Sequence, residues 1–276
     1  MMERLVMLRL QADGCRAEVW LNDIPVASSV TQTGALMVPV HEYLLPGDNR
    51  LQLVVSSAEH RLPGPAGTSG GPGGPGGPRL LGQPARARVR LMLPRLGQPG
   101  HEAHARTLTE IQLELDPEAD TGESRVEERV VPVPAHWPRW RWQELPPIRS
   151  VEDVRPLITR FVRLVGTALA QGDVDGLLQA SQLRLEDVAQ AYGQSTADLA
   201  QRWRQRLVQL QQQGALRLAL PQGRDIVLRP CGGGRLVQCD GDDGLPVLRS
   251  QPDAEGHRVY WPLRVAVLRG HCHVMR

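Results

Sequence analysis

The sequence contains no lysine, so every basic side chain apart from the histidines is an arginine. Together with abundant Ala, Gly, Pro and Leu, this indicates the codon bias of a GC-rich bacterial genome and carries no functional signal. Phenylalanine is almost absent as well, since Phe161 is the single example among 276 residues. The six tryptophans therefore supply most of the large aromatic surface.

Long apolar runs are also missing, and no stretch of about 18 apolar residues suggests a membrane span. The first ten residues include Glu3, Arg4 and Arg9, which interrupt the apolar core that a signal peptide needs. We therefore expect a cytoplasmic protein. The formal net charge of +2 gives no reason to expect nucleic acid as a partner.

Cysteine is scarce and scattered, and the chain is long enough to build a core without disulfides. A three-residue turn after Cys231 would place Cys231 and Cys239 on one sheet face but four rows apart, about 13 Å at ~3.3 Å per residue. That separation is too wide for one zinc ion. His271 and His273 could chelate from one strand face, but we read them as ordinary strand residues and predict no metal and no cofactor.

The first half of the chain alternates apolar and polar residues with a period of two, which is typical of half-buried strands. Strands are expected over 3–12, 16–22, 35–40, 51–55, 85–93, 107–115 and 124–133. If 85–93 and 107–115 are antiparallel neighbours, their outer faces form an arginine–glutamate ladder. The pattern predicts an antiparallel β-sandwich of jelly-roll type.

A Gly/Pro-rich segment over 62–84 cannot bury enough apolar surface to become ordered, so we predict a disordered loop inside the sandwich. The domain boundary is expected later, at Pro146-Pro147, where the apolar period changes from 2 to 3.6. The predicted domains are therefore residues 1–145 and 146–276.

The second domain is predicted to be α+β, with helices packed on one face of a curved antiparallel sheet. A helix capped by Ser150 should run to Gly172, two short helices should follow, and another helix should start at Ser195. Strands are expected over 215–220, 225–231, 235–240, 245–249 and 257–269. Asp240, Asp242 and Asp243 indicate a polar hairpin turn.

Two resemblances to known folds accompany these patterns. The segment AEVWLNDIPV…LMVPVHEYLLPGDNRLQLVV resembles galactose-binding-like jelly rolls, with Asn22 and Asn49 at motif positions. In those modules the motif is a turn device, which implies that the asparagine before the strand binds loop backbone and not sugar. The second half, with ALAQGDVDGLLQAS, resembles the SnoaL-like (cystatin-like) α+β cone, and that likeness transfers no catalytic residue.

The most distinctive segment of the chain is HWPRWRW, over 136–142. On an extended strand Trp140 and Trp142 would share one face, with Arg139 and Arg141 on the other. Aromatic side chains with polar neighbours suit a sugar ring or a protein partner. We therefore take the three tryptophans, Trp137 included, and the two arginines as candidate binding residues, although packing within the protein is the competing interpretation.

A second candidate site is the interior of the predicted cone. If it were an enzyme pocket, a histidine or aspartate there would be the acid–base group; a filled core is the alternative. The candidate lining is Tyr192, Trp203, His257, Tyr260 and Trp261.

The sequence favours a non-catalytic binding or protein-interaction protein with a protein or carbohydrate ligand. A SnoaL-like enzyme or small-ligand binder, and a bacterial immunity or secretion-system accessory protein, are the alternatives.

Overall fold

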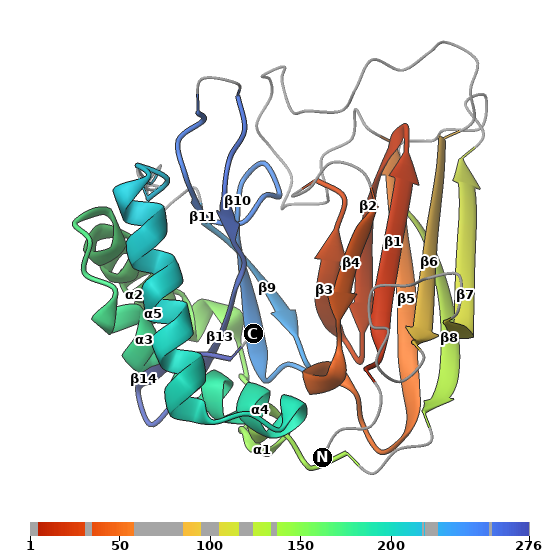
Figure 1. Ribbon diagram of the computed structural model, residues 1–276, viewed down its shortest axis with the longest axis horizontal. Helices are drawn as coiled ribbons and strands as arrows, with labels where there is room; N and C mark the ends of the chain where they lie inside the picture. Colours follow the sequence, from red (N-terminus) through yellow and green to blue (C-terminus); the bar gives the residue numbers. More distant parts are fainter. Residues whose placement is uncertain are drawn as a thin grey trace. The chain divides into compact units, whose positions relative to one another are not determined.

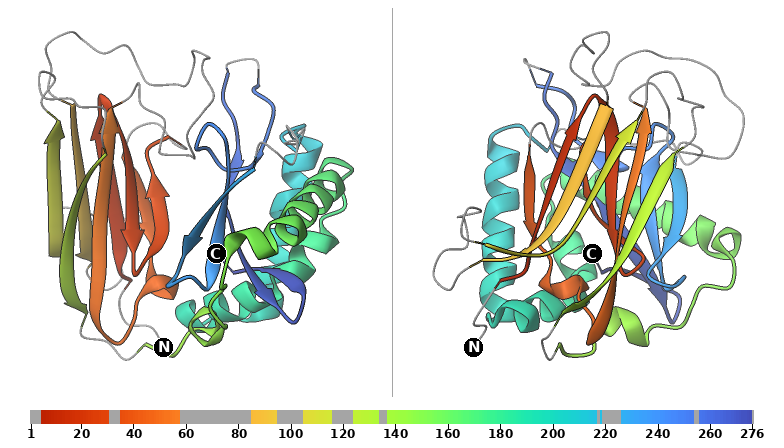
Figure 2. Two further views of the ribbon diagram at one scale, coloured as in Figure 1. Left: turned by 180° about the vertical axis from the view of Figure 1, so that it is seen from behind. Right: turned by 90° about the vertical axis from the view of Figure 1, so that its right-hand side faces the viewer.

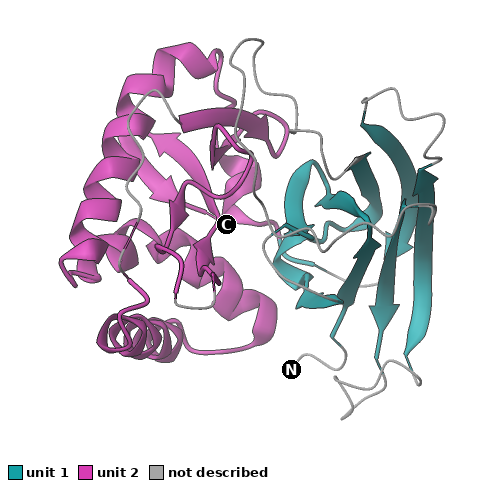
Figure 3. Ribbon diagram, turned by 90° about the horizontal axis from the view of Figure 1, so that it is seen from above, with its two compact units in different colours: residues 1–138 teal, residues 139–276 magenta. Residues whose placement is uncertain are grey.

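The computed structural model describes residues 5–30, 35–57, 85–94, 105–115, 124–133, 137–216, 218, 226–253 and 256–275. The chain divides into two compact units, Met1–Pro138 and Arg139–Arg276 (Figure 3). The boundary expected at 145/146 falls within the second unit. The predicted loop 62–84 lies outside the described residues.

The described residues of the first unit form antiparallel strands and one short 3-10 helix (Figure 1). Its two sheets have the strand orders β4-β1-β6-β7 and β3-β2-β5-β8 and pack face to face (Figure 2). The elements are β1 (Met7–Asp13), β2 (Cys15–Leu21), β3 (Ile24–Ser28), β4 (Leu36–Pro39), η1 (His41–Tyr43), β5 (Gly47–Ser57), β6 (Ala85–Leu93), β7 (Arg106–Leu115) and β8 (Arg125–Val133).

The core of this unit follows directly from the alternation in the sequence. Leu51, Leu53 and Val55 point inward from β5, and Val89 and Leu91 point inward from β6. All five side chains are fully buried. Burial of one such side chain contributes about 1.5–3 kcal/mol, so the apolar face fixes the register of each strand.

The predicted arginine–glutamate ladder is confirmed on the outer face of β6 and β7. Arg90 is the Cα partner of Glu110, whose carboxylate lies 2.7 Å from Arg88 and 3.5 Å from Arg90. The hydrogen bond from Arg88 lowers the pKa of Glu110. Because Arg88 is exposed and the side chains of Arg90 and Glu110 are still partly accessible to water and salt, the ladder favours the register and adds little to stability.

One strand of the first unit, β3, was missed by the sequence analysis. Asn22 and Asp23 have φ values of 53° and 64°, and Leu21 pairs directly with Ile24. A two-residue turn with positive φ at both positions joins antiparallel strands without splaying them. The Asn-Asp pair that follows the strand predicted over 16–22 is therefore the turn of a hairpin that leads into β3.

The side chains of Asn22 and Asn49 bond to each other and to the backbone of the loop that precedes β5. Asn49 Oδ1 accepts from the Leu45 N–H and from Asn22 Nδ2, both at 2.8 Å. Asn49 Nδ2 donates to the carbonyls of Leu45 at 3.0 Å and Gly47 at 2.9 Å. Asn22 Nδ2 also donates to the Tyr43 carbonyl, at 2.8 Å. Both side chains therefore hold the loop between β4 and β5.

The second unit begins with helices and ends with strands, in the predicted order. Ser150 and Ser195 start α2 and α5, since their Oγ atoms accept from the N–H groups of Glu152 and Asp198. The helices are α1 (Arg141–Glu144), α2 (Val151–Ala170), α3 (Asp175–Ala180), α4 (Gln182–Tyr192) and α5 (Thr196–Gln212). None of the helices in the described ranges combines the length and apolar character needed to cross a membrane.

The strands of the second unit form a four-stranded antiparallel sheet of order β14-β13-β10-β9 and a separate short pair, β11-β12. Helices α2, α3 and α4 contact strands at the edges of the sheet, and an apolar cluster fills the space beneath them. The strands are β9 (Ile226–Cys231), β10 (Leu236–Gly241), β11 (Leu248–Arg249), β12 (Tyr260–Trp261), β13 (Leu263–Leu268) and β14 (His271–Val274).

Three of the predicted strands in this unit are wrong in extent. The long strand over 257–269 is divided at Pro262, which has no N–H to donate to a ladder, into β12 and β13. The strand over 245–249 is reduced to β11. Of the described residues in 215–220, only Leu218 makes a bridge, to Ser250.

Candidate functional site

The sheet of the second unit has two chemically different faces. On β10, Val237 and Cys239 belong to the apolar cluster beneath the helices. Because successive side chains of a strand point to opposite faces, Leu236, Gln238 and Asp240 lie on the other side. We call this other side the second face of the sheet.

Polar residues occupy the middle of the second face, where a buried sheet normally carries apolar side chains. Arg229 of β9, Gln238 of β10 and Arg264 of β13 are Cα partners in one row across three strands. Asp240 lies on the same face, two residues along β10 from Gln238. Asp240, Gln238 and Arg264 are only 2%, 4% and 8% exposed. These four residues form what we call the polar cluster.

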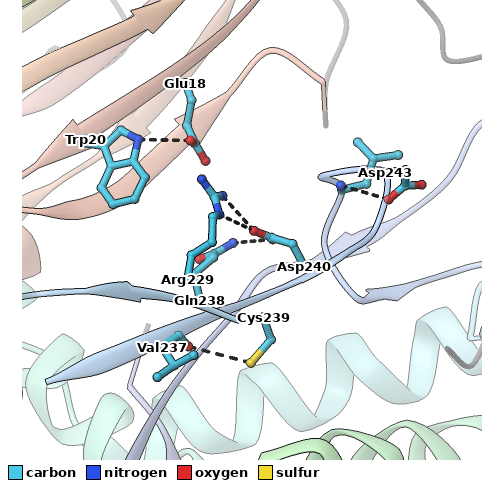
Figure 4. Close-up of polar contacts among 9 residues, drawn as sticks. Glu18, Trp20, Arg229, Val237, Gln238, Cys239, Asp240 and Asp243 are labelled. Atoms are coloured by element: carbon cyan, nitrogen blue, oxygen red, sulfur yellow. Dashed lines mark hydrogen bonds and ion pairs between the residues drawn. The ribbon is translucent and has the colours of Figure 1, made fainter. Parts of the chain in front are cut away.

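Hydrogen bonds in the polar cluster converge on Asp240 (Figure 4). Arg229 donates to Asp240 Oδ2 from Nε at 2.9 Å and from Nη2 at 2.7 Å. Gln238 Nε2 donates to Asp240 Oδ1 at 2.8 Å. Both carboxylate oxygens are therefore used, and the charge of Arg229 is balanced within the cluster.

The remaining polar atoms of the cluster lack partners. Gln238 Oε1 and Arg264 Nε are buried and make no hydrogen bond within the described part of the chain. Arg264 also forms no ion pair there. Buried polar groups are hydrogen-bonded in most proteins, and an unpaired one costs about 1–3 kcal/mol. The cluster thus offers one free acceptor and one uncompensated cation.

The histidines of β14 lie on the second face as well. His273 is the Cα partner of Ala266, two residues along β13 from Arg264, and His271 is the partner of Leu268. Burial lowers the pKa of His273, and the neighbouring His271 lowers it further. Both effects favour the neutral imidazole of His273.

The expected placement of Cys231 and Cys239 on one face is wrong. The β9–β10 turn has four residues, and Cys231 pairs with Leu236, one position later than expected. Cys231 therefore lies on the second face, whereas Cys239 lies beneath the helices, where burial raises the pKa of its thiol. Among the described residues no group of three or more His, Cys, Asp or Glu side chains could hold a metal ion.

The tryptophan-rich segment does not form the predicted strand. Trp140 precedes α1 and Trp142 lies within it, so the two do not alternate along an extended backbone. Both side chains are buried, whereas Arg139 is exposed and Arg141 pairs with Glu186. Trp137, in the first unit, is half-buried and meets the His41 ring edge-on at 4.8 Å. Trp140 and Trp142 therefore do not form an exposed aromatic surface.

A buried carboxylate and a glycine turn hold α1 in the second unit. Asp187 of α4 accepts from the Arg141 N–H at 3.2 Å, and Gln143 Oε1 accepts from the Trp140 N–H at 2.8 Å. A Cβ atom added to Gly232 would lie 3.5 Å from the Trp142 ring and 3.3 Å from the Leu236 side chain. Trp142 therefore packs over the β9–β10 turn at one end of the second face.

This packing predicts a difference between two glycines of the same turn. Gly232 and Gly234 both have positive φ, 59° and 73°, but only a Cβ at Gly232 meets neighbours. Gly234→Ala should lower the free energy of unfolding by about 1 kcal/mol through backbone strain alone. Gly232→Ala should lower it by about 2 kcal/mol and change tryptophan fluorescence. Equal effects of the two substitutions in urea unfolding would contradict the placement of Trp142.

Among the described residues, the apolar cluster near the candidate pocket residues contains no histidine or aspartate that could act as the expected acid–base group. Trp203 and Trp261 pack against the apolar cluster beneath the helices, and the Arg184 guanidinium lies 5.3 Å from the centre of the Trp203 ring. The His257 side chain is exposed and lies 3.7 Å from Asp253. Tyr192 ends α4, and Tyr260 belongs to β12, both half-buried.

The polar cluster was missed by the sequence analysis, although a signal for it exists. In the strand LVQCDG the polar residues recur with a period of two, and Arg264 interrupts the apolar run LRVAVL. A solvent-exposed sheet face gives the same alternation, so the pattern locates these residues on one face without revealing their burial.

Comparison with known proteins identifies no family model, no curated protein and no solved structure that matches this chain.

Proposed function

We propose that the chain is a non-catalytic binding protein that recognises a protein partner through the second face of its C-terminal sheet. In this proposal the first unit is a galactose-binding-like scaffold and the second a SnoaL-like scaffold. The arginine and glutamine side chains of the polar cluster make the contacts.

The observation that carries the proposal is the unpaired state of Arg264 Nε and Gln238 Oε1 at buried positions. A buried cation without a counter-charge destabilises the fold that contains it. Apolar side chains at these positions would extend the surface formed by Leu236 and Ala266. Groups that lower stability in this way are typical of binding sites, where the ligand supplies the missing partners.

The chemistry of the cluster favours binding over catalysis. Arginine stays protonated in proteins and glutamine has no titratable proton, so neither is a general acid or base at neutral pH. Asp240 is held by hydrogen bonds to both carboxylate oxygens, from Arg229 and Gln238. The helix side of the sheet is filled by apolar residues.

Removal of the uncompensated charge should stabilise the protein. We expect Arg264→Met to raise the free energy of unfolding by about 1–2 kcal/mol, because the unpaired guanidinium is replaced by an apolar chain of similar length. Arg160→Met, at an exposed position on α2, is the matched control and should stay within about 0.5 kcal/mol of the wild type. Urea unfolding of the full chain measures both values.

The functional experiment compares the same three proteins as baits. Immobilised wild type, Arg264→Met and Arg160→Met are exposed to extract from the source organism, and captured proteins are identified by mass spectrometry. The proposal predicts a partner that the wild type and Arg160→Met retain and that Arg264→Met loses, although this variant is at least as stable. Capture of the same proteins by all three baits would refute a role for the second face.

A further inference from the structure

The two unpaired groups of the polar cluster specify what the occupant must offer. We infer that the second face binds an acidic segment of the partner protein, in which an aspartate or glutamate carboxylate pairs with Arg264 while an N–H group donates to Gln238 Oε1. This inference rests on the proposed function and adds the chemistry of the ligand.

The relative placement of the two residues supports one ligand residue engaging both. Gln238 and Arg264 are direct Cα partners on the neighbouring strands β10 and β13, on the same face. Side chains at such positions start only about 4.5–5.5 Å apart. The free acceptor and the free donor therefore lie side by side, and a single acidic residue carries a carboxylate and a backbone N–H at a comparable spacing.

The charges of the second face favour an anionic occupant. The guanidinium of Arg229 is paired with Asp240, whereas Arg264 has no ion pair within the described ranges. An arginine paired with a carboxylate makes charge-assisted hydrogen bonds that are roughly twice as strong as neutral ones. A neutral sugar would satisfy the hydrogen bonds but leave the charge buried and uncompensated.

A phosphodiester fits this pair of groups less well than a peptide does. Its ionised oxygens would accept from Arg264, but it has no donor for Gln238 Oε1. Nucleic-acid recognition also relies on several cations acting together, and the other arginine of the cluster is already neutralised by Asp240. The combination of one acceptor and one cation therefore matches an acidic peptide segment.

The test uses the full-length protein labelled with nitrogen-15 and three small probes. N-acetyl-aspartate methylamide carries both the carboxylate and the N–H groups. N-acetyl-asparagine methylamide is its neutral counterpart, and inorganic phosphate supplies anionic oxygens without amide N–H groups. The side-chain N–H resonances of Arg264 and Gln238 are followed during each titration.

We expect the aspartate probe to shift both resonances saturably, and the asparagine probe to bind at least about tenfold more weakly. Phosphate should shift the Arg264 resonance alone. Arg264→Gln should abolish the response to the aspartate probe, and Gln238→Leu should weaken it several-fold. Thermal unfolding of each variant confirms that it remains folded.

Two results would overturn the inference: no saturable shift with the aspartate probe, or an unchanged response in Arg264→Gln. A preference for phosphate over the aspartate probe would also overturn it and indicate a phosphorylated ligand. These failures are distinguishable from failure of the proposed function. If Arg264→Met still loses a captured partner while the aspartate probe does not bind, the binding function stands and the acidic-peptide ligand falls.

Discussion

Replacement of Asp240 by leucine is expected to lower the free energy of unfolding of the second unit by about 3–5 kcal/mol, the largest effect predicted for this protein. Asp240 is 2% exposed and accepts hydrogen bonds from Arg229 and from Gln238. Its loss leaves the Arg229 guanidinium without this counter-charge and the Gln238 amide without this acceptor. Urea unfolding followed by tryptophan fluorescence measures the change.

A double variant separates the ion pair from a simple loss of packing. Arg229→Met combined with Asp240→Leu removes both charges and leaves apolar side chains in their place. Because an apolar pair can replace a buried ion pair at little cost, the double variant should recover at least half of the stability that Asp240→Leu alone loses. Arg229→Met is also measured alone. If the stability losses of Arg229→Met and Asp240→Leu simply add in the double variant, the ion pair between Arg229 and Asp240 does not stabilise the second unit.

Asp240 and Arg264 are expected to respond to substitution in opposite directions. Both residues are charged and buried on the second face, but one is fully paired and the other is not. Substitution of Asp240 should destabilise, and substitution of Arg264 should stabilise. If the cluster only stabilised the fold, substitution of either residue would lower the free energy of unfolding.

Strand alternation predicted much of the first unit because one periodicity determines both the element and its face. The ladder of β6 and β7 follows from Arg86, Arg88 and Arg90 facing away from Val89 and Leu91. The hairpin partner β3 was missed because IPVAS is short, contains proline and follows a turn signal. In that case the pairing in three dimensions, and not the local pattern, decides that the segment is a strand.

Turn length was the weakest element of the prediction in the second unit. All three residues of Gly232-Gly233-Gly234 have positive φ, and Arg235 completes the turn as a fourth residue. A change of one residue in turn length moves every side chain of one strand to the opposite face relative to the other. The predicted shared face of Cys231 and Cys239 depended on that length, which composition does not determine.

The candidate binding residues were inferred from composition, and composition does not distinguish a buried tryptophan from an exposed one. Trp140 and Trp142 belong to the segment around α1 and are buried there. The polar cluster was not predicted, because polar residues that alternate along a strand indicate a solvent-exposed face. Burial of Gln238 and Arg264 is a property of the tertiary structure and appears only when the strands are placed side by side.

Removal of the Asn49 side chain should produce the largest loss of stability in the first unit. Asn49 is fully buried, and its amide group makes four hydrogen bonds that hold Leu45, Gly47 and Asn22. Asn49→Ala removes these four hydrogen bonds, so we expect the free energy of unfolding to fall by about 3 kcal/mol. Urea unfolding of the full chain, with calorimetry to separate the transitions of the two units, measures the effect.

Asn49→Asp tests whether the donors of this amide matter as much as its acceptor. Aspartate keeps an oxygen for the Leu45 N–H and for Asn22 Nδ2, but it places a second oxygen against the Leu45 and Gly47 carbonyls in place of the N–H donors. We therefore expect a loss at least as large as that of Asn49→Ala. Asp48→Ala, at the exposed neighbouring position, is the control and should change stability by less than about 0.5 kcal/mol. A stability for Asn49→Ala equal to that of this control would mean that the asparagine does not hold the loop.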